Sequence, residues 1–359
     1  MEYNKCKLYS KEASLMRNLT MLTDLYQLTM MYGYFKNGMT QNEGVFDIFF
    51  RPRNNITYTV TAGLESVINY INVLHFSQED IAYLRSLNLF DEPFLEALAE
   101  LRFTGDIYAM PEGTVAFPYE PLLRVRAPIM QAQLIETAML TFINHQTLIA
   151  TKASRVCYAA GDGAVMEFGL RRAQGADAGI YGARAAVIGG CASTSNVLAG
   201  QMFDIKISGT HAHSWVMSFP DEISAFRAYA EIFPDACLLL VDTYDTLKSG
   251  VPNAIRVFNE LRANGHEPMG IRLDSGDLAY LSKRARQMLD EAGFPNAKIC
   301  ASSDLDETVI RELKMQGCRI DLWGVGTKLI TSEDNPALGG VYKMSAEVVN
   351  GQVVPKIKL

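Results

Sequence analysis

The feature that most constrains the fold is a regular alternation of strand-like and helix-like segments in the second half of the chain. Between Cys237 and Ile320, apolar runs recur about every 30 residues, and each is followed by the apolar spacing of an amphipathic helix. We expect strands at 203–209, 236–244, 268–276, 297–304 and 319–327, and helices at 221–233, 251–265, 277–293 and 306–317. Because parallel strands need a long crossover connection, this order predicts parallel βαβ units in an α/β domain.

Polar or small residues follow the predicted strands. They are Ser208–His211, Asp242–Asp245, Arg272–Asp277, Ser302–Asp304 and Gly324–Thr327. In parallel α/β folds, whether barrels or open sheets, ligands bind at the carboxyl ends of the strands, so we expect these groups to meet on one face. Helix capping accounts for nearby residues such as Asp306 and Ser249, but it does not account for an arginine at a strand end.

The first half of the chain has a different pattern, in which helices and short strands are mixed. Helices are expected at 21–38, 63–99 and 129–156, a strand at 44–51, and short antiparallel strands at 105–128. A β-like segment after Gly340 and the hairpin signal Asn350-Gly351 indicate that the C-terminus returns to this domain. We therefore predict an N-terminal α+β domain of residues 1–135, completed by 341–359, and an α/β domain of residues 136–340. Because the chain stops directly after a hairpin, we also expect it to be part of a longer polypeptide.

Composition and charge argue against several classes of protein. The chain has 359 residues, of which 48% are hydrophobic and 20% charged, as in compact soluble proteins. Its net charge of −7 argues against a nucleic-acid-binding surface, and no apolar run approaches the ~18 residues of a membrane span. The six cysteines lie far apart, and the N-terminus has no signal-peptide core. We expect a cytoplasmic protein that binds small molecules, and neither nucleic acid nor a membrane.

Two of the five histidines, His211 and His213, lie in the segment "SGTHAHSW". An H-x-H pair at a strand end is typical of metal-dependent hydrolases of barrel fold, but such sites need further ligands, and His75, His145 and His266 are not at predicted strand ends. Two other interpretations stay open. The histidines could pack or hydrogen bond within the protein, or one could be a nucleophile, since a neutral imidazole is nucleophilic near pH 7. We expect no tightly bound metal.

The segment "GIRLDSGDL" places Arg272 at the end of a predicted buried strand. A buried arginine without a ligand must be paired inside the protein, and Asp274 or Asp277 could pair with it. The functional interpretation is an anion clamp, because a guanidinium binds a carboxylate or phosphate through two hydrogen bonds. The aspartates could then hold Mg²⁺ or ribose hydroxyls.

Two further motifs indicate phosphate binding. "WGVGTKL" follows the last predicted strand, where Gly324 and Gly326 would let backbone N–H groups face an anion and Thr327 would add a hydroxyl. "FGLRRAQG" contains the adjacent pair Arg171 and Arg172, which is either a solvated helix start or a phosphate-binding group.

Taken together, these motifs resemble those of a known family. "LTDLYQLTM", "FGLRRAQG", "SNVLAG", "GTHAHSW", "IRLDSGDL", "GVGTKL" and "LGGVYK" occur in this order between residues 22 and 343. In order and content they are similar to nicotinate phosphoribosyltransferase, of the subgroup with a barrel domain. The resemblance implies an irregular α/β barrel, a wrapping N-terminal domain and a homodimer with shared active sites. It also implies that nicotinate and phosphoribosyl pyrophosphate give nicotinate mononucleotide and pyrophosphate, with ATP as a co-substrate that is hydrolysed through a phosphohistidine.

The motifs and the resemblance together suggest roles for individual residues. His213 would be phosphorylated; Tyr26, Thr210 and Arg272 would bind nicotinate; Thr327, Gly326, Gly324, Arg171, Arg172 and Ser303 would bind the phosphoribosyl group and its phosphates; Asp274 and Asp277 would bind Mg²⁺ or ribose.

The chemistry of this reaction agrees with these residue types. The pyridine nitrogen of nicotinate is already a nucleophile, so catalysis requires its alignment with the anomeric carbon and no general base. Basic groups and Mg²⁺ would stabilise the departing pyrophosphate, and Arg272 supplies a cation for the substrate carboxylate. Three alternatives remain. The chain could be a phosphoribosyltransferase for nicotinamide or quinolinate, a metal-dependent barrel hydrolase that uses His211 and His213, or a catalytically inactive ligand-binding protein.

Overall fold

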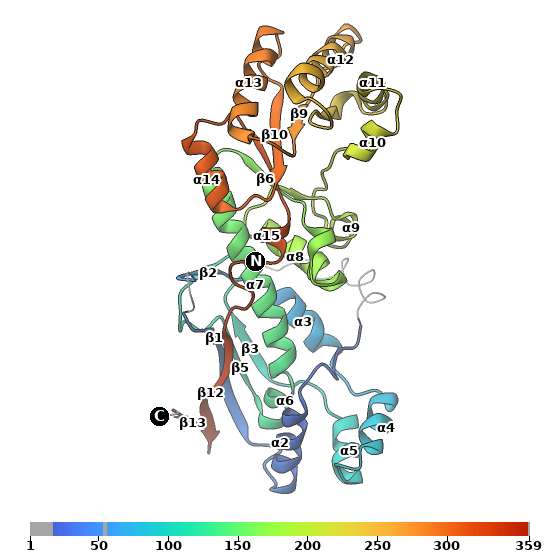
Figure 1. The fold of residues 1–359 in the computed structure, drawn as a ribbon. Coiled ribbons are helices and arrows are strands. Elements are labelled where there is room, and N and C mark those ends of the chain that lie inside the picture. The colour runs from blue at the N-terminus through green and yellow to red at the C-terminus, as the bar shows by residue number, and fades with distance from the viewer. Residues whose placement is uncertain (1–16, 53–55, 358–359) are drawn as a thin grey trace. The chain divides into compact units, whose positions relative to one another are not determined.

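The computed structural model describes residues 17–52 and 56–357, and the chain forms two compact units (Figure 1). The first comprises Met1–Leu148 with Ala337–Leu359, and the second comprises Ile149–Pro336. The domain boundaries proposed near residues 135 and 340 stay predictions.

A five-stranded antiparallel sheet forms the centre of the first unit. In spatial order its strands are β13 (Gln352–Pro355), β12 (Gly340–Val349), β1 (Glu43–Phe50), β5 (Leu123–Pro128) and β3 (Asp106–Ala109), and β2 (Thr59–Val60) pairs separately with β4 (Val115–Ala116). The C-terminal strands therefore complete the N-terminal sheet, as the sequence predicted. Asn350 and Gly351 form the turn between β12 and β13 with positive φ angles of 51° and 76°, as a tight hairpin turn requires.

The helices of the first unit are α2 (Leu25–Lys36), α3 (Leu64–Val73), α4 (Gln78–Ser86), α5 (Glu92–Ala99), α6 (Ile129–Leu134) and the first part of α7 (Glu136–Ala160). The single helix predicted at 129–156 is wrong, because the helix is interrupted at Ile135, between α6 and α7. Tyr342 of β12 donates its hydroxyl to Ala132 O at 2.8 Å, the carbonyl that a continuous helix would pair with Glu136 N. This tertiary contact lies at the break.

Six parallel strands form the sheet of the second unit. In spatial order they are β7 (Ser193–Thr194), β6 (Ala164–Glu167), β11 (Leu322–Val325), β10 (Lys298–Ser303), β9 (Gly270–Leu273) and β8 (Leu238–Leu240). The helices are α8 (Ala176–Ile188), α9 (Val197–Phe203), α10 (His213–Met217), α11 (Glu222–Ile232), α12 (Val251–Ala263), α13 (Leu278–Glu291), α14 (Glu307–Met315) and α15 (Thr327–Ile330). Strands β8 to β11 all lie inside the predicted runs, so the predicted α/β class is confirmed.

The strand predicted at 203–209 is wrong. Asn196 caps α9, which extends to Phe203, and within 203–209 only Ile207 forms a β-bridge, to Thr194 of β7. The following residues reach β8 through single hydrogen bonds, from Thr210 Oγ1 to Leu238 O (2.7 Å) and from Leu240 N to His211 Nε2 (3.2 Å). This segment therefore links the two edge strands of the sheet without a strand ladder, and the closed barrel stays a prediction.

Helix capping was predicted correctly for Asp306, which accepts a hydrogen bond from Val309 N at 2.8 Å at the start of α14. It was wrong for Ser249. That residue lies inside a π-helical turn, Thr246–Gly250, which Asp245 caps, and its hydroxyl donates to Glu222 at 2.5 Å.

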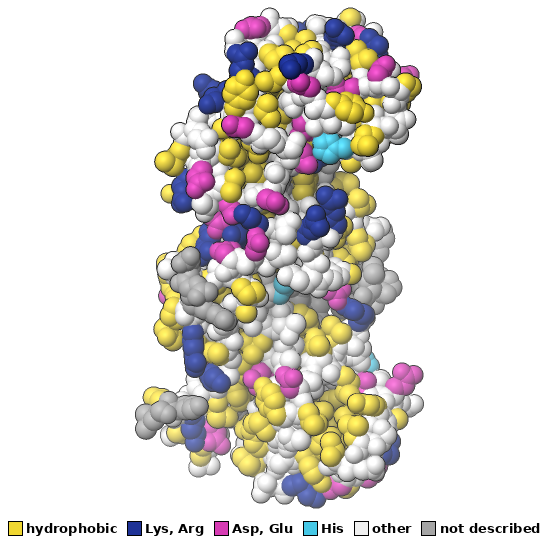
Figure 2. All heavy atoms as spheres, viewed as in Figure 1, with side chains coloured by type: hydrophobic (Ala, Val, Ile, Leu, Met, Phe, Trp, Pro, Cys, Tyr) yellow, Lys and Arg dark blue, Asp and Glu magenta, His cyan; other side chains and the backbone are white. Residues whose placement is uncertain are grey.

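The surface in Figure 2 has Lys and Arg side chains intermixed with Asp and Glu side chains on the face drawn. This face therefore has no continuous basic surface of the kind that binds nucleic acid. In the described ranges, even α7, with 25 residues, is not apolar enough to cross a membrane, and the other helices do not qualify either.

Candidate active site

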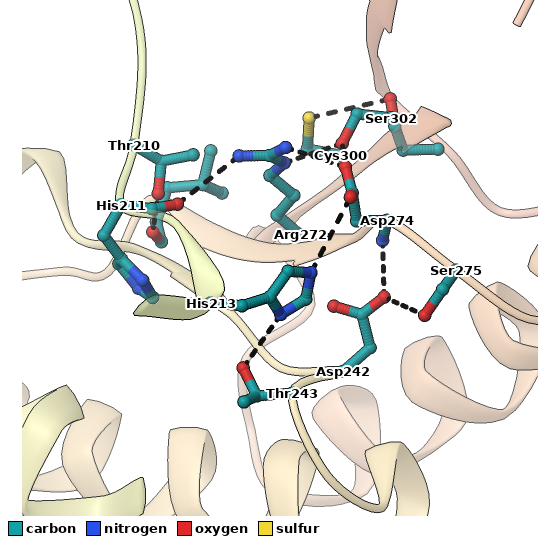
Figure 3. A network of polar contacts seen from close by, with 12 residues as sticks. Thr210, His211, His213, Asp242, Thr243, Arg272, Asp274, Ser275, Cys300 and Ser302 are labelled. Atoms are coloured by element: carbon teal, nitrogen blue, oxygen red, sulfur yellow. Dashed lines mark hydrogen bonds and ion pairs between the residues drawn. The ribbon is translucent and has the colours of Figure 1, made fainter. Parts of the chain in front are cut away.

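The carboxyl ends of β8, β9 and β10 bring a group of polar side chains together (Figure 3). Arg272 lies on β9, Asp274 directly after it and Ser302 on β10. Because β9 and β10 are neighbours in register, with Arg272 opposite Cys300, Ser302 lies one side-chain repeat further along the same face. His213 and Thr243 approach this group from the start of α10 and from the loop after β8.

Arg272 is held by three protein acceptors. Its Nε donates to Ser302 Oγ at 2.6 Å, its Nη2 to Asp274 Oδ1 at 2.7 Å, and its Nη1 to His211 O at a long 3.4 Å. Its guanidinium also lies 5.9 Å from the ring centre of Phe168. The predicted internal pairing with Asp274 therefore exists. A guanidinium has five N–H groups, so Nη1 and Nη2 each keep one N–H beyond these bonds with which a ligand could pair.

Asp274 is ionised in this arrangement. Burial alone would raise the pKa of its carboxyl, but the hydrogen bond from Ser302 and the charge of Arg272 outweigh burial and hold the pKa below its ordinary value. Ser302 donates to Asp274 Oδ1 at 2.5 Å, so one oxygen accepts both from Ser302 and from Arg272. The other oxygen, Oδ2, faces His213 Nε2 at 3.7 Å.

His213 is the more open of the two histidines, with 38% of its side chain exposed. Its Nδ1 lies 3.1 Å from Thr243 Oγ1. When Nδ1 carries the proton and donates to Thr243, Nε2 keeps its lone pair and points toward Asp274. The imidazole is thus oriented by the hydroxyl of Thr243 at Nδ1, and its Nε2 faces the carboxylate of Asp274.

His211 has a structural role. Its side chain is buried, its Nε2 accepts a hydrogen bond from Leu240 N at 3.2 Å, and its ring packs edge-on to Tyr229 at 4.7 Å. Burial, with a smaller effect from the charge of Arg272, lowers its pKa to about 4, so the ring is neutral. The rings of His211 and His213 point away from each other (Figure 3), and no group of three or more His, Cys, Asp or Glu side chains suited to a metal occurs within residues 17–52 and 56–357.

The other predicted site residues of this cluster differ in whether their side chains already have hydrogen-bond partners within the protein. Thr210 donates its hydroxyl to Leu238 O at 2.7 Å, and Asp277 caps α13 by accepting from Tyr280 N at 2.9 Å. Ser303 is exposed at the end of β10. Thr210 and Asp277 therefore already have structural partners, and their predicted ligand roles stay predictions.

The two predicted phosphate-binding motifs lie side by side. Phe168 N donates to Val325 O at 2.8 Å, and a Cβ added at Gly169 would lie 2.8 Å from Gly326 O. Arg171 and Arg172 are exposed in a short 3₁₀ turn, Leu170–Arg172, after β6. The structure therefore brings the arginine pair next to the glycine loop, Gly324–Thr327, at the same edge of the sheet.

Tyr26 belongs to the first unit, at the start of α2, and is 48% exposed. Its hydroxyl donates to Glu136 Oε1 at 3.0 Å. Partial burial and the nearby charge of Glu136 raise its pKa to about 12, so the phenol stays neutral and presents an aromatic face to its surroundings.

Four residues of the cluster received no individual role from the sequence. They are Phe168, Asp242, Thr243 and Ser302. Asp242 Oδ2 accepts from Asp274 N and from Ser275 Oγ, both at 2.7 Å, which fixes the loop after β9. For Asp242, Thr243 and Ser302 the available signal was a position at a predicted strand end, and for Phe168 it was the motif "FGLRRAQG". Which partner each side chain meets depends on the order of strands in the sheet.

A parallel α/β sheet with cations and glycine turns at the carboxyl ends of its strands is typical of enzymes that bind anionic, phosphorylated substrates. Two family models match the chain: the N-terminal domain of nicotinate phosphoribosyltransferase over residues 21–144, and the nicotinate phosphoribosyltransferase family over residues 164–358. The chain belongs to the nicotinate phosphoribosyltransferase family and is an enzyme of that family.

Individual relatives agree with this assignment. A nicotinate phosphoribosyltransferase of Bacillus subtilis is 54% identical over 346 residues, which cover 95% of this chain and 70% of that protein. The crystal structure of human nicotinic acid phosphoribosyltransferase matches with a TM-score of 0.82 and 32% identity, over 94% of this chain and 76% of the human one. A nicotinate-nucleotide pyrophosphorylase of Pyrococcus furiosus matches with a TM-score of 0.74 and 25% identity, over 99% of this chain and 81% of that one. The resemblance found in the sequence is thus confirmed.

Proposed function

We propose that this enzyme transfers the phosphoribosyl group of phosphoribosyl pyrophosphate to the ring nitrogen of nicotinate, giving nicotinate mononucleotide and pyrophosphate for NAD biosynthesis. Membership of the family supports the reaction. The main structural support for placing the reaction at one site is the cluster around Arg272 at the carboxyl ends of β8, β9 and β10.

Arg272 would bind the carboxylate of nicotinate. The free N–H groups on Nη1 and Nη2 are suited to a planar carboxylate, while Nε and part of Nη2 stay with Ser302 and Asp274. Nicotinamide has no negative charge and would gain less from this cation. The ring of Phe168 beside the guanidinium offers an apolar wall for the pyridine, and Tyr26 and Thr210 are the other proposed contacts.

The phosphoribosyl substrate would bind at the neighbouring turns. Arg171 and Arg172 would pair with its phosphates, and the backbone N–H groups and hydroxyl of Gly324–Thr327, with Ser303, would hold the remaining phosphate oxygens. Alignment of the pyridine nitrogen with the anomeric carbon would then supply most of the catalysis, because no proton has to be removed.

Magnesium fits one carboxylate of the cluster. Asp274 would hold Mg²⁺ through Oδ2, since Oδ1 already accepts from Arg272 and Ser302. One protein carboxylate together with substrate phosphate oxygens is a usual donor set for this ion. When bound, Mg²⁺ neutralises negative charge that builds up on the leaving pyrophosphate. Asp277 suits the ion less well, because its Oδ1 caps α13.

ATP would act through His213. The unprotonated Nε2 would attack the γ-phosphorus, forming an N–P bond as the bond to the β-phosphate oxygen breaks and ADP leaves. Thr243 would keep the ring in place during this step. The phosphorylated ring adds negative charge beside Asp274 and Arg272, and this charge would couple ATP hydrolysis to substrate affinity and product release.

We further propose that the enzyme is a cytoplasmic homodimer in which each active site is shared. The exposed face of α2, which includes Leu25 (53%), Tyr26 (48%) and Met30 (39%), supports a contact with a second copy.

The reaction is tested by a product assay on the purified chain with phosphoribosyl pyrophosphate and Mg²⁺, with and without ATP. Nicotinate, nicotinamide and quinolinate are supplied in separate reactions, and product is identified by mass. We expect nicotinate mononucleotide from nicotinate, more of it with ATP, and little product from nicotinamide. Turnover of quinolinate with loss of CO₂, and none of nicotinate, would overturn the proposal.

A further inference from the structure

The side chain of Glu167, at the end of β6, is fully buried, and the turn that contains Arg171 and Arg172 follows it directly in the chain. We propose that Glu167 and Thr194 form a positioning pair that fixes the turn containing Arg171 and Arg172, and thereby sets the affinity for the phosphoribosyl substrate. This inference rests on the proposed function, since it assigns the arginine turn to that substrate.

Each oxygen of Glu167 accepts one hydrogen bond, one from the end of a neighbouring strand and one from the loop that follows β6. Thr194, at the end of β7, donates its hydroxyl to Oε2 at 2.6 Å. The backbone N–H of Gly169, two residues after Glu167, donates to Oε1. A buried carboxylate without a cation partner is costly unless such donors are present, so the two bonds constrain the loops that provide them.

The bond to Gly169 determines the start of the arginine turn. Gly169 O accepts from Arg172 N at 2.7 Å, which closes the turn that displays both arginines. A side chain at Gly169 would meet Ile330 Cβ at 2.5 Å, so the backbone there is packed against α15. Glu167 thus holds the peptide from which the turn begins, on a backbone that has no room to move toward α15.

Thr194 joins this turn to a second loop. Its Oγ1 accepts from Asn196 N at 3.0 Å while it donates to Glu167, and Asn196 Nδ2 donates to Gly179 O of α8 at 3.1 Å. Ser195 N donates to Glu167 O at 2.9 Å. The segments at the ends of β6 and β7 are therefore joined through the carboxylate of Glu167. A further hydrogen bond, from Phe168 N to Val325 O at 2.8 Å, connects the same turn to β11, which contains the start of the glycine loop.

Glu167 is not itself a substrate ligand. Its side chain has no exposed surface, both of its oxygens point to protein donors, and a carboxylate would repel a phosphate. The pair therefore acts on the substrate through the turn and not by contact.

Thr194 allows a matched test. Thr194→Val keeps the shape and removes the hydroxyl, whereas Thr194→Ser keeps the hydroxyl. Thr147→Val is the control, because Thr147 is also fully buried, exchanges hydrogen bonds with the backbone of Ala62 at 3.0 and 3.1 Å, and belongs to the first unit. For each purified variant, kcat, the KM of both substrates and the melting temperature are measured, together with direct binding of phosphoribosyl pyrophosphate by calorimetry.

We expect Thr194→Val to raise the KM and the dissociation constant of phosphoribosyl pyrophosphate about tenfold, the effect of about one hydrogen bond to a charged group, with the KM of nicotinate changed less than about twofold. Thr194→Ser should restore most of the affinity. Thr147→Val should lower the melting temperature and leave both KM values unchanged. If Thr194→Val only lowers the melting temperature, as the control does, the pair is merely structural and the inference is wrong.

Glu167→Gln covers the case in which Thr194→Val does not fold, because the amide is isosteric but can accept only on one side. It should reproduce the rise in KM for phosphoribosyl pyrophosphate, and an unchanged KM would overturn the inference. Failure of the proposed function is seen separately, as a wild-type enzyme that forms no nicotinate mononucleotide.

Discussion

Arg272 donates to Ser302 and Asp274 before any substrate arrives, so its guanidinium is held in one orientation with N–H groups still free. The two interpretations that the sequence left open, internal pairing and an anion clamp, are therefore compatible, because the two edges of one guanidinium can serve different partners. His211 illustrates the opposite outcome, in which a histidine of a motif is bound into the core and remains neutral.

Removal of Arg272 tests the clamp. Arg272→Ala should weaken nicotinate binding by about 1.5–3 kcal/mol, the contribution of a charged hydrogen bond, and this loss should appear as a KM for nicotinate raised by about tenfold or more. Ser302→Ala should have a smaller effect in the same direction, because it only loosens Arg272. Arg227→Ala removes a surface ion pair with Glu260 and is the control. A normal KM for nicotinate, together with lost binding of phosphoribosyl pyrophosphate, would make Arg272 a phosphate ligand instead.

The buried His211 predicts a specific acid sensitivity. Its pKa is about 4 in the folded chain, below the ordinary value of 6.5, so as the pH falls the unfolded chain takes up the proton first. Stability should therefore decrease between pH 6.5 and pH 4, by roughly 3 kcal/mol in total at about 1.4 kcal/mol for each pKa unit. His211→Gln keeps an acceptor for Leu240 N but does not titrate. Urea denaturation across this pH range should show a shallower loss for His211→Gln, and equal slopes for the two proteins would contradict the assignment.

At the scale of elements, strand ends and short helices place the reactive groups. His213 is the first residue of α10, a helix of five residues, and its ring is oriented from the loop after β8 by Thr243. The glycine loop begins inside β11, where Gly324 lies against Phe168 and Ser302. His213 and the glycine loop are thus each positioned by residues of elements other than their own.

Phosphorylation of His213 can be measured with γ-labelled ATP. Wild type should acquire acid-labile phosphate, and His213→Ala should not, because the nucleophilic nitrogen is absent. Thr243→Val should reduce the labelling, since the ring loses its orienting hydroxyl. His211→Gln should keep the label. Survival of the label in His213→Ala would show that another group is phosphorylated.

Gly324 leaves no room for a side chain. A Cβ at this position would lie 2.6 Å from Phe168 Cδ2 and 3.2 Å from Ser302 Cβ. Gly324→Ala should therefore lower the free energy of unfolding by about 1–3 kcal/mol through overpacking, and should impair nicotinate binding by displacing these side chains. Gly33→Ala in α2 meets nothing within 4 Å and should be neutral or slightly stabilising. Chemical denaturation of both variants measures these free energies of unfolding. Equal stability of the two variants would contradict the packing argument.

At the scale of the whole molecule, residues distant in sequence complete the first unit. β12 pairs with β1 over all of Glu43–Phe50, and Tyr342 stacks on Phe46 with ring centres 4.8 Å apart. The N-terminal sheet therefore depends on residues that follow the α/β unit in sequence, so the first unit is built from two separate segments of the chain, whereas the second is continuous.

The proposed shared active site is tested by mixing two inactive chains. If Tyr26 contributes to the partner's site, a hybrid of Tyr26→Ala and His213→Ala contains one site with both defects and one intact site. Mixed and refolded chains should then regain part of the wild-type ATP-stimulated activity, while each variant refolded alone stays far below it. No recovery, after mass spectrometry verifies that hybrids form, would argue that each chain has a complete site of its own.

The sequence alone determined the local elements and the family. Apolar runs and helical spacing predicted β8 to β11 with their helices, and Asn350-Gly351 predicted a hairpin that forms. These features depend on residues within one or two turns of each other, so a local pattern is sufficient to detect them. The motifs were long enough to indicate nicotinate phosphoribosyltransferase, which the comparisons confirm.

Only the tertiary structure decided which groups meet. The segment 203–209 looks like a strand, yet it ends α9 and forms a single bridge, because its neighbours in space and not its own residues determine its pairing. Ser302 contacts Arg272 only because β10 lies beside β9, and Glu167 gains Thr194 as a donor only because β7 lies beside β6. A buried polar side chain must find its partner across the sheet, and the order of strands, which no local pattern encodes, selects that partner.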